Sequence, residues 1–378
     1  MSRRRESDAT PPGASAAVAA ALDATSGPGA ILQALRAHPD VALSGEGLSQ
    51  ALGVSRAQVW KHVGTLRRRG YRIEGEPGGG YRLRGAPDRL YAEEVQNGLA
   101  TGWLGRRYLH LDDTDSTNRV AFDLGRDGEP AGTAVVAERQ SAGRGRLGRS
   151  FFSPPHTNLY TSLLLRPTGS IADAPTLILG AAVAVAETVA DFLGDESLVE
   201  IKWPNDVLIR RRKTSGILME SSAEGARLAF AVLGIGVNLN VDRDLFPDEF
   251  RSHATSLASE LGAPVDRVAF TRRLFEALED QLDRHAAGGF EALRPRFESF
   301  FRMRGEPVGV LEMAGRRLDG VALGIAPDGA LEVEVGAGPR RGEVVRVMAG
   351  DVTLAKTHAD PTATASADAL AKAPPDAR

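Results

Sequence analysis

Cysteine is absent from this sequence of 378 residues. Its absence excludes a disulfide framework, a thiolate nucleophile, and any zinc or iron–sulfur site with cysteine ligands. The chemistry of the chain must therefore depend on other groups, such as charged side chains, backbone donors or bound ions. A cysteine-free chain also fits a reducing compartment, and we expect a cytoplasmic location.

Long uninterrupted apolar runs are missing as well. The nearest, Leu177–Val189, contains Glu187 and is shorter than the roughly 20 residues that cross a membrane. It predicts a buried core helix. The weakly apolar run Ala14–Leu22 follows three arginines, but acidic residues, prolines and a glycine interrupt the approach to it. This pattern favours a disordered tail over a signal peptide, and we expect no membrane partner.

The chain as a whole lacks a strong excess of charge, because its net charge is -3. Residues 29–85 nevertheless hold nine Lys or Arg and four Asp or Glu, a net charge of +5, which leaves -8 for the rest. A basic domain on an acidic protein is typical of a part that binds a phosphate backbone. A chain of this length should form two or three domains.

Residues 29–85 have the pattern of a winged helix-turn-helix. Two short helical patterns precede a third helix, for which Ser55 and Gln58 have the spacing of a capping box. Tyr71–Glu76 and Gly80–Arg84 then predict two strands joined by a turn rich in proline and glycine. Three helices followed by a hairpin predict a DNA-binding domain.

The rest of the chain predicts an α/β (α+β) part and a β part. Strands are expected at Thr133–Glu138, Leu159–Leu165, Val199–Ile201, Gly216–Glu220 and Ala229–Val237, and the clearest helices at Ala182–Phe192 and Val268–His285. Short strands between Pro307 and Leu354 predict a small β-barrel. The expected division is a disordered tail (1–28), the winged helix (29–85), a catalytic domain (86–304), the barrel (305–355) and a second disordered tail (356–378).

A loop rich in glycine and arginine, residues 140–149, is the most informative motif. Gly143, Gly145 and Gly148 spell G-x-G-x-x-G, but residues 150–155, Ser-Phe-Phe-Ser-Pro-Pro, cannot begin the helix that a dinucleotide site needs. We therefore reject that interpretation. Two remain: a solvated basic loop, or a loop whose backbone amides and guanidinium groups bind phosphate or carboxylate.

Four further segments are weak signals when each is taken alone. Lys202–Asp206 (Lys-Trp-Pro-Asn-Asp) is typical of a turn after a strand, and Lys213–Gly216 lies in the next hairpin. Asp115–Asn118 suits a helix N-cap. Gly234–Asn238 has glycines within a strand, which indicates close approach by a ligand or a neighbouring side chain.

Together, and in their order along the chain, the five segments resemble the bifunctional, repressor-type biotin protein ligases over about residues 29–355. The resemblance implies a central mixed-sheet ligase domain of the class II synthetase-like type, between the winged helix and an SH3-like β-barrel. It also implies a two-step reaction with biotin, ATP and Mg²⁺. The biotin carboxylate attacks the α-phosphorus of ATP, giving biotinyl-5'-AMP and pyrophosphate, and a lysine of a biotin carboxyl carrier protein, from acetyl-CoA carboxylase or a related enzyme, then displaces AMP.

The resemblance further implies roles for individual residues. The pocket for the biotin ureido group is expected at Ser116, Thr117, Asn118 and Gln140, and a loop over the biotin carboxylate and the ATP phosphates at Arg144, Gly145 and Arg146. Contacts to the carboxylate and phosphate oxygens are expected at Lys213 and Gly216. Lys202 and Asp206 are expected near the triphosphate, with Asp206 at the magnesium ion, and Asn238 is expected close to the nucleotide. Both reactants of the first step are anionic, so such a site needs positive charge and fixed geometry rather than a covalent nucleophile.

In the resembling proteins the third helix enters the major groove of operator DNA. The residues expected to contact DNA are Ser55, Arg56, Gln58 and Lys61, with Arg82 on the wing. A homodimer is expected when the adenylate is bound, to match a two-fold operator. One alternative is a monofunctional ligase with a non-regulatory winged helix, and another is a regulator that senses biotin without catalysis.

Overall fold

The computed structural model describes residues 27–76, 79–168, 170, 173–225, 227–312, 317–348 and 350–354. The tails predicted at 1–28 and 356–378 lie outside the described residues, apart from Gly27 and Pro28. The chain forms two compact units, one of residues 1–302 with 327–329 and the other of residues 303–326 with 330–378.

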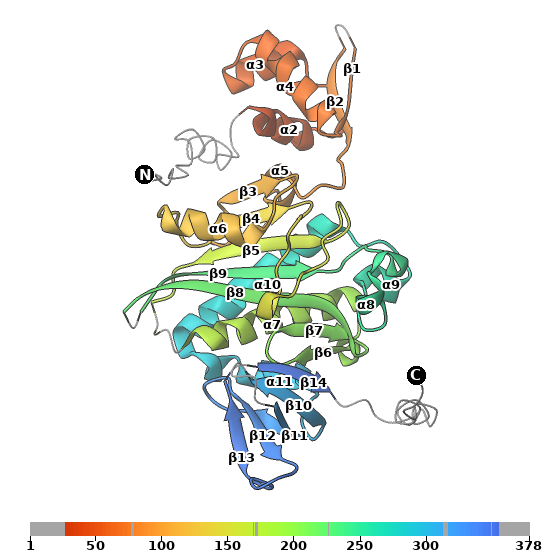
Figure 1. The fold of residues 1–378 in the computed structure, drawn as a ribbon. Coiled ribbons are helices and arrows are strands. Elements are labelled where there is room, and N and C mark those ends of the chain that lie inside the picture. The colour runs from red at the N-terminus through yellow and green to blue at the C-terminus, as the bar shows by residue number, and fades with distance from the viewer. Residues whose placement is uncertain are drawn as a thin grey trace, which may run out of the picture. The chain divides into compact units, whose positions relative to one another are not determined.

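The predicted winged helix-turn-helix is confirmed (Figure 1). It consists of α2 (Pro28–Ala37), α3 (Gly45–Leu52) and α4 (Arg56–Arg68), followed by the antiparallel hairpin of β1 (Arg72–Glu76) and β2 (Gly80–Gly85). The apolar faces of these elements meet in one core, formed by Ile31, Leu32, Leu35, Leu48, Val59, Val63, Leu66, Tyr71 and Ile73. Helices this short depend on such burial more than on helix propensity.

α4 begins where the sequence predicts. Ser55 Oγ accepts the N–H of Gln58 at 3.2 Å, and Gln58 Oε1 accepts the N–H of Ser55 at 2.8 Å. Before it, α3 ends at Gly53, whose φ of 65° is in the left-handed region that glycine adopts without strain. These two caps fix the turn between the helices, so the exposed face of α4 has a defined orientation.

The central sheet has seven strands and is mixed. In spatial order they are β3 (Tyr108–Leu111), β4 (Ala134–Ala137), β5 (Leu159–Leu165), β9 (Arg227–Val237), β8 (Arg212–Glu224), β7 (Asp206–Ile209) and β6 (Val199–Lys202). β3 and β4 are parallel, and the other neighbouring pairs are antiparallel. The predicted α/β architecture with a mixed sheet is confirmed.

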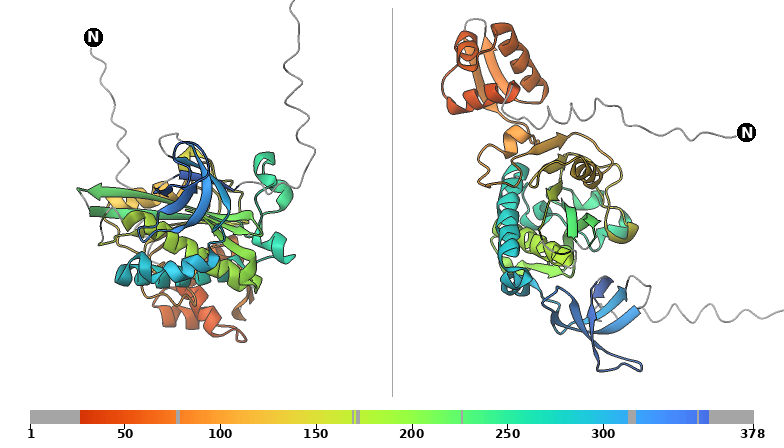
Figure 2. Two further views of the ribbon diagram at one scale, coloured as in Figure 1. Left: turned by 90° about the horizontal axis from the view of Figure 1, so that it is seen from below. Right: turned by 90° about the vertical axis from the view of Figure 1, so that its left-hand side faces the viewer.

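Helices cover both faces of this sheet (Figures 1 and 2). α6 (Thr117–Arg126) packs on one face, where Ala121 and Leu124 join the buried cluster around Phe230. α7 (Ala174–Leu193) and α10 (Arg267–Gly288) pack against each other on the other face. The shorter helices are α5 (Ala92–Val95), α8 (Asp248–Arg251), α9 (Leu257–Leu261) and α11 (Arg294–Phe300).

α7 is long and apolar enough to cross a membrane, but 72% of its apolar stretch is buried inside the protein. The predicted buried core helix at Leu177–Val189 is therefore confirmed. The predicted start at Ala182 is wrong, because a helix that is apolar on all sides has no periodic stripe to mark its first turn. The helix begins instead at Ala174, with Pro175 in its first turn.

The second unit contains an antiparallel sheet of five strands, consistent with the predicted SH3-like barrel. In spatial order they are β13 (Val344–Val347), β12 (Leu331–Val335), β11 (Arg317–Ile325), β10 (Pro307–Glu312) and β14 (Gly350–Leu354). Along β12, the buried residues Leu331, Val333 and Val335 alternate with Glu332 and Glu334, as expected for such a strand. The sequence predicts neither β14 nor the four-residue strands β3 and β7, because runs this short show too little alternation.

Glu138, which follows β4, is fully buried and joins several parts of the first unit. Arg267, at the start of α10, is also buried, and both of its Nη atoms donate to Glu138 Oε2 at 3.0 Å. The N–H of Leu90 donates to Oε1 at 2.7 Å, and rings of His110 and His156 lie 3.4 and 3.3 Å from the carboxylate. Burial alone would raise the pKa of Glu138, but the hydrogen bond with His110 and the charge of Arg267 outweigh it and lower the pKa to about 2.

Replacing Glu138 should therefore destabilise the first unit strongly. Glu138→Gln leaves the buried Arg267 guanidinium with only the exposed Asp88 carboxylate as a counter-charge, and we expect a loss of about 3–5 kcal/mol in the free energy of unfolding, measured by urea titration. The matched control is Asp191→Asn, which breaks the half-exposed ion pair between Asp191 and Arg273. That change should cost no more than about 1 kcal/mol. Equal losses in the two variants would contradict the role of burial.

The same pair gives a pH dependence of known sign. The pKa of Glu138 is lower in the folded chain than its ordinary value of 4.5, so the folded state gains stability above that value. This gain should disappear as the pH falls from about 4.5 toward 2. Urea titrations across this range should show a steeper loss for the natural chain than for Glu138→Gln.

Candidate active site

Several predicted site residues lie on one face of the central sheet. Pairing across five strands places Tyr160, Gly236, Gly216, Asp206 and Lys202 in one row. Residues directly opposite one another across paired strands point to the same side of a sheet. Segments that are far apart in the sequence therefore meet on this face.

Glycines of β8 and β9 form a surface without side chains, which we call the glycine floor: Gly216, Gly234 and Gly236. A methyl group added to Gly234 would lie 2.0 Å from Asn118 Oδ1, and one added to Gly236 would lie 2.6 Å from the Phe151 ring. At Gly216 it would lie 3.1 Å from Lys213 Nζ. The close approach predicted from glycines within a strand is confirmed, and the groups that approach are side chains of the candidate site.

A β-bulge brings Lys213 to the same face. Val207 pairs with Ser215 and Leu208 pairs with Lys213, so Thr214 is an extra residue in β8. A bulge shifts the alternation of side chains and re-aims the next one. The backbone of Lys213 is also fixed, because its N–H donates to His253 O at 2.8 Å and its carbonyl accepts the N–H of Thr255 at 2.9 Å.

The predicted ureido pocket is a connected hydrogen-bond network. Gln140 Oε1 accepts the N–H and the hydroxyl of Thr117 at 2.9 and 3.1 Å, and Gln140 Nε2 donates to Ser153 Oγ at 3.2 Å. Ser162 Oγ lies 2.8 Å from Thr117 Oγ1 and 2.6 Å from Asn118 Oδ1. The network fixes polar groups above the glycine floor, where a ligand with several donors and acceptors can bind.

Ser116 is the N-cap of α6, as the sequence predicts, but its hydroxyl makes no capping hydrogen bond. Its own N–H donates to Asp115 Oδ1 at 2.6 Å. The N–H of Thr117, which has no partner within the first turn of the helix, donates a hydrogen bond to Gln140 instead. The start of α6 is thus tied to the segment that precedes the glycine and arginine loop.

Glu220 connects this network to the loop. Its Oε2 accepts Asn118 Nδ2 at 2.9 Å, and its Oε1 lies 3.4 Å from Arg144 Nη1. Further along the loop, Arg146 Nη1 donates to Asn205 Oδ1 at 3.0 Å. Arg144 therefore has a partner on β8, and Arg146 has one in the turn between β6 and β7.

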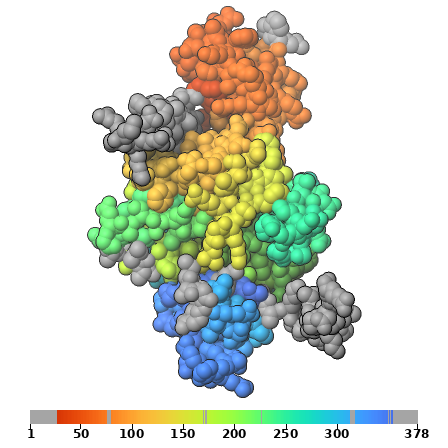
Figure 3. Space-filling model, viewed as in Figure 1, coloured from red at the N-terminus to blue at the C-terminus, as the bar shows by residue number. Residues whose placement is uncertain are grey.

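The loop itself turns back tightly. The N–H of Gly145 donates to Arg149 O at 2.7 Å, and Arg144 forms a bridge with Ser150. Leu147, at the tip, has a φ of 57°, a strained value for a branched side chain. A short 3₁₀ turn at Arg146–Gly148 leads into extended chain rather than a helix, which agrees with rejection of the dinucleotide motif. In Figure 3 the yellow part of the chain, which includes this loop, lies on the front of the central domain beside green atoms.

Lys213 and Asp206 form a close ion pair. Lys213 Nζ lies 2.6 Å from Asp206 Oδ1, yet this buried oxygen accepts no hydrogen bond of ordinary geometry among the described residues. Such an oxygen is suited to be a ligand of a metal cation. No group of three or more His, Asp or Glu side chains in the described part of the chain could enclose a metal ion. The residues present thus fit a magnesium ion held mainly by a ligand's phosphates, with one carboxylate from the protein.

Asn238 and Lys202 are placed less directly. The Asn238 amide is buried, accepts from Asn158 Nδ2 at 3.3 Å and donates to Thr255 O at 3.2 Å. These contacts hold the end of β9 beside the segment that fixes Lys213. Lys202 is half-buried and ends β6 opposite Asp206. Roles of both residues toward a nucleotide stay predictions.

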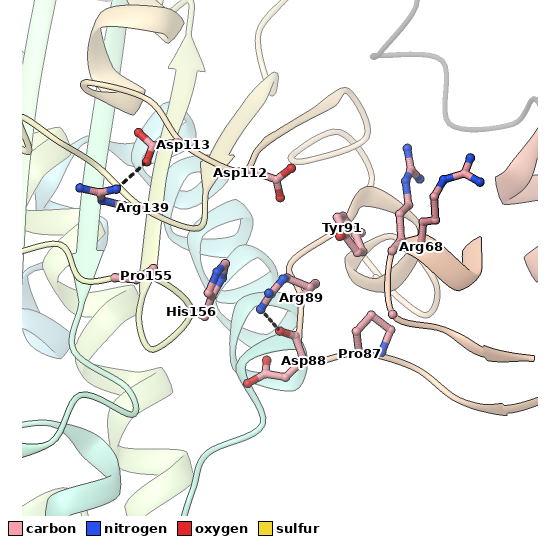
Figure 4. Close-up of a pocket in the computed structure, with 12 residues that line it drawn as sticks. Arg68, Pro87, Asp88, Arg89, Tyr91, Asp112, Asp113, Arg139, Pro155 and His156 are labelled. Carbon is pink, nitrogen blue, oxygen red and sulfur yellow. Dashed lines mark hydrogen bonds and ion pairs between the residues drawn. The ribbon is translucent and has the colours of Figure 1, made fainter. Parts of the chain in front are cut away.

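Two cavities lie next to this region. One of about 500 Å³ is bordered by Gln140, Gly143 and Phe151 and by the segment around α8. The other, of about 700 Å³, lies between α4 and the central sheet and includes Arg68, Asp112 and His156 (Figure 4). Its described lining contains none of the predicted site residues. The smaller cavity therefore belongs to the candidate site.

The arrangement can hold two anions above a surface without side chains. Arg144, Arg146, Lys202 and Lys213 come from three segments, and two of them bind the neighbouring residues Asn205 and Asp206. Positive charge fixed in advance stabilises negative charge that develops in a transition state. The geometry suits a reaction between two anionic ligands without a nucleophile from the protein.

The sequence prediction missed several residues that shape this site: Phe151, Ser153, Ser162, Asn205 and Glu220. Asn205 lies within a segment that the sequence singles out, and Phe151 and Ser153 follow the loop directly. Ser162 is buried in the apolar strand β5, and a polar residue at a buried strand position is the signal that could have found it. Glu220 is half-buried in the more polar strand β8 and carries no such signal.

The residues predicted to contact DNA are exposed or half-exposed on the winged helix. Ser55 and Gln58 serve the capping box of α4. Arg56 and Lys61 are exposed on the same helix, and Arg82 is half-exposed on β2. Contact with DNA stays a prediction for these residues.

Comparison with known proteins gives matches for both parts of the first unit. Residues 111–238 match the Biotin/lipoate A/B protein ligase family, and residues 30–82 match the HTH domain family. The bifunctional ligase/repressor BirA of Bacillus subtilis is 36% identical over 316 residues, which cover 82% of this chain and 94% of that protein. BirA of Escherichia coli is 32% identical over 312 residues, with coverage of 82% and 92%. The solved structure of the biotin protein ligase from Aquifex aeolicus in complex with biotin and ATP is 28% identical, covers 65% of this chain and 97% of that chain, and has a TM-score of 0.56.

The glycine floor should tolerate no side chain. Gly234→Ala would drive a methyl group into Asn118 Oδ1 and separate this side chain from Ser162 and Glu220. We expect a loss of about 1–3 kcal/mol in the free energy of unfolding, as for other overpacked interiors. The control is Gly102→Ala, whose methyl group would meet only Glu279 Oε1 at 3.6 Å. Equal stabilities for the two variants would show that Asn118 moves away freely.

Proposed function

Since the chain belongs to the family of bifunctional biotin ligase/repressors, we propose that it joins biotin to a carrier protein by way of biotinyl-5'-AMP and binds operator DNA through its winged helix. The observation that carries the catalytic proposal is the convergence of Gln140, Asn118, Arg146 and Lys213 around the glycine floor. Gln140 and Arg146 come from one loop, and Asn118 and Lys213 come from two other segments. Gln140 and Asn118 belong to the hydrogen-bond network, Lys213 contacts the floor at Gly216, and Arg146 donates to Asn205. The helix-turn-helix match at residues 30–82 supports the second half of the proposal.

In the first step, the biotin carboxylate oxygen attacks the α-phosphorus of ATP. The bond from the α-phosphorus to the bridging oxygen breaks, and pyrophosphate leaves. We assign the ureido group to the network of Thr117, Asn118 and Gln140, with Ser116 beside it, because a ureido group has both donors and acceptors. Lys213 then lies near the two reacting anions and reduces their mutual repulsion.

Asp206 would hold a magnesium ion together with the phosphates of the nucleotide. Bound there, the ion would neutralise phosphate charge. The residues of the chain have separate tasks: Lys202 and Lys213 supply fixed positive charge, Gly216 leaves space for the Lys213 side chain, and Asn238 keeps the end of β9 in place.

In the second step, the amine of a carrier lysine attacks the carboxyl carbon of the adenylate and releases AMP. The adenylate is a mixed anhydride that water also attacks. Arg144 and Arg146 would close over it with Gly145 as the hinge, and to do so they would leave Glu220 and Asn205, which they contact in this structure. A closed loop keeps water out until the carrier binds.

The carrier would be the biotin carboxyl carrier protein of acetyl-CoA carboxylase or a related carboxylase. We further propose that the adenylate-bound chain forms a homodimer on a two-fold operator, with contacts from Arg56, Lys61 and Arg82. A cytoplasmic location follows from the proposal, since carrier, nucleotide and DNA meet there.

A transfer assay tests the proposed activity. The purified chain, incubated with biotin, ATP, Mg²⁺ and a biotin carboxyl carrier protein, should give a carrier band that binds streptavidin on a blot. Omission of ATP is the control and should abolish the band. A carrier that stays unmodified under full conditions would refute the ligase proposal.

Lys213 should matter mainly for the first step. We expect Lys213→Ala to lower the single-turnover rate of adenylate formation by about 10²–10³-fold, the cost of one charged donor in a pre-organised site. The matched control is Lys61→Ala, the same substitution on the winged helix, which should leave this rate unchanged. An unaltered rate in Lys213→Ala would remove the residue from the proposed chemistry.

Arg146 should matter for retention of the adenylate. Arg146→Gly removes the side chain that binds Asn205 and loosens the loop, so we expect adenylate to escape and modify lysines on the enzyme itself. Streptavidin blots without carrier measure this self-modification, and ATP–pyrophosphate exchange monitors the first step. Absence of self-modification, with exchange at the level of the natural chain, would argue against a retaining role.

A further inference from the structure

The largest exposed apolar side chain of the winged helix has no role in its core. Trp60 on α4 is 71% exposed, more than any other large apolar residue described. The buried residues Val59, Val63 and Leu66 lie on another side of α4, centred roughly a quarter-turn from Trp60. Single exposed apolar residues are common on proteins, so exposure alone assigns nothing to Trp60.

The surroundings of Trp60 leave its indole standing clear of the helix. The residues three before and four after it on the same stripe are Ala57 and Gly64. A methyl group added to Gly64 would meet only Arg68 Nη1, at 3.6 Å. Small residues on both sides therefore give a low helix surface from which one large ring projects, and a broad partner can approach it.

The cations nearest to Trp60 are available, while those farther along the helix are used within the fold. The side chains of Arg56 and Lys61 are exposed and make no hydrogen bond or ion pair with other described residues. By contrast, Arg67 donates to Ile73 O at 2.8 Å and Arg69 pairs with Glu93. An apolar ring between unpaired cations fits a polyanion that also offers an apolar group.

Duplex DNA meets this description. An α-helix fits the major groove, where the 5-methyl group of thymine is the apolar feature among hydrogen-bonding base edges. At the start of α4, the polar side chains of Ser55 and Gln58 bond to each other in the capping box. Trp60 is therefore the side chain on this face best suited to an apolar contact with a base.

We propose that Trp60 determines part of the operator sequence by contacting a thymine 5-methyl group in the major groove. The inference rests on the DNA-binding half of the proposed function and adds a specificity-determining residue to it. Arg56 and Lys61 beside it bind phosphates and position the helix, without selecting a base.

The experiment begins with selection of duplexes from a random 30-base-pair pool by the full chain with biotin, ATP and Mg²⁺. The selected site should contain thymine at a fixed position in each half-site. Replacing that thymine with deoxyuridine removes only the methyl group, and it should weaken binding of the natural chain about fourfold, the worth of one buried methyl group.

Two variants separate the proposal from general DNA binding. Trp60→Ala should bind the thymine and deoxyuridine duplexes equally, and a pool selected with it should lose the preference at that position. Lys61→Ala should bind both duplexes more weakly, keep the fourfold ratio, and show a salt dependence reduced by about one phosphate contact. Thermal unfolding of each variant checks that the winged helix stays folded.

Fluorescence gives an independent measurement. The chain has three tryptophans; Trp203 is 2% exposed, Trp103 is half-buried and Trp60 is 71% exposed, so iodide should quench Trp60 most strongly. The selected duplex should protect the natural chain from iodide and leave Trp60→Phe unaffected.

Retention of the thymine preference in Trp60→Ala would overturn the proposal while DNA binding stands. A pool in which the natural chain enriches no sequence would overturn both. Loss of self-association in Trp60→Ala, with the preference intact, would assign the ring to a second copy of the chain.

Discussion

The first unit depends on a single buried carboxylate. Glu138 accepts hydrogen bonds from Arg267 on α10 and from the backbone of Leu90, which lies between the winged helix and the central sheet. Two charges without water around them are stable only while both are present and well paired. Gln140 follows two residues later, so this ion pair helps to position the ligand network.

On the central sheet, the absence of side chains at glycine positions shapes the site as much as the side chains that are present. The glycine floor gives Asn118, Phe151 and Lys213 space to lie flat against the strands. The bulge at Thr214 then aims Lys213 across this floor. Binding chemistry on this face therefore depends on backbone register and on the absence of a side chain at the three floor positions.

Much of the fold could be predicted from the sequence because local signals and tertiary packing agree. The capping box at Ser55 marks the start of α4, and glycines within β9 indicate close approach. Prediction fails where the signal is not local. α7 is apolar on every side, so its first turns carry no stripe, and the bulge at Thr214 depends on strand pairing that one segment cannot reveal. Glu220 belongs to the site only because β8 places it opposite Asn118 and Arg144.

Three of the four cations of the site have a partner within the protein: Glu220 for Arg144, Asn205 for Arg146 and Asp206 for Lys213. A small anion such as free phosphate would have to replace these partners one at a time, with little gain from any single exchange. A ligand that carries several anionic oxygens at set distances replaces them together and loses its freedom of motion only once. The internal pairing thus protects the site from the abundant simple anions of the cell, and it selects for molecules long enough to span all three cations.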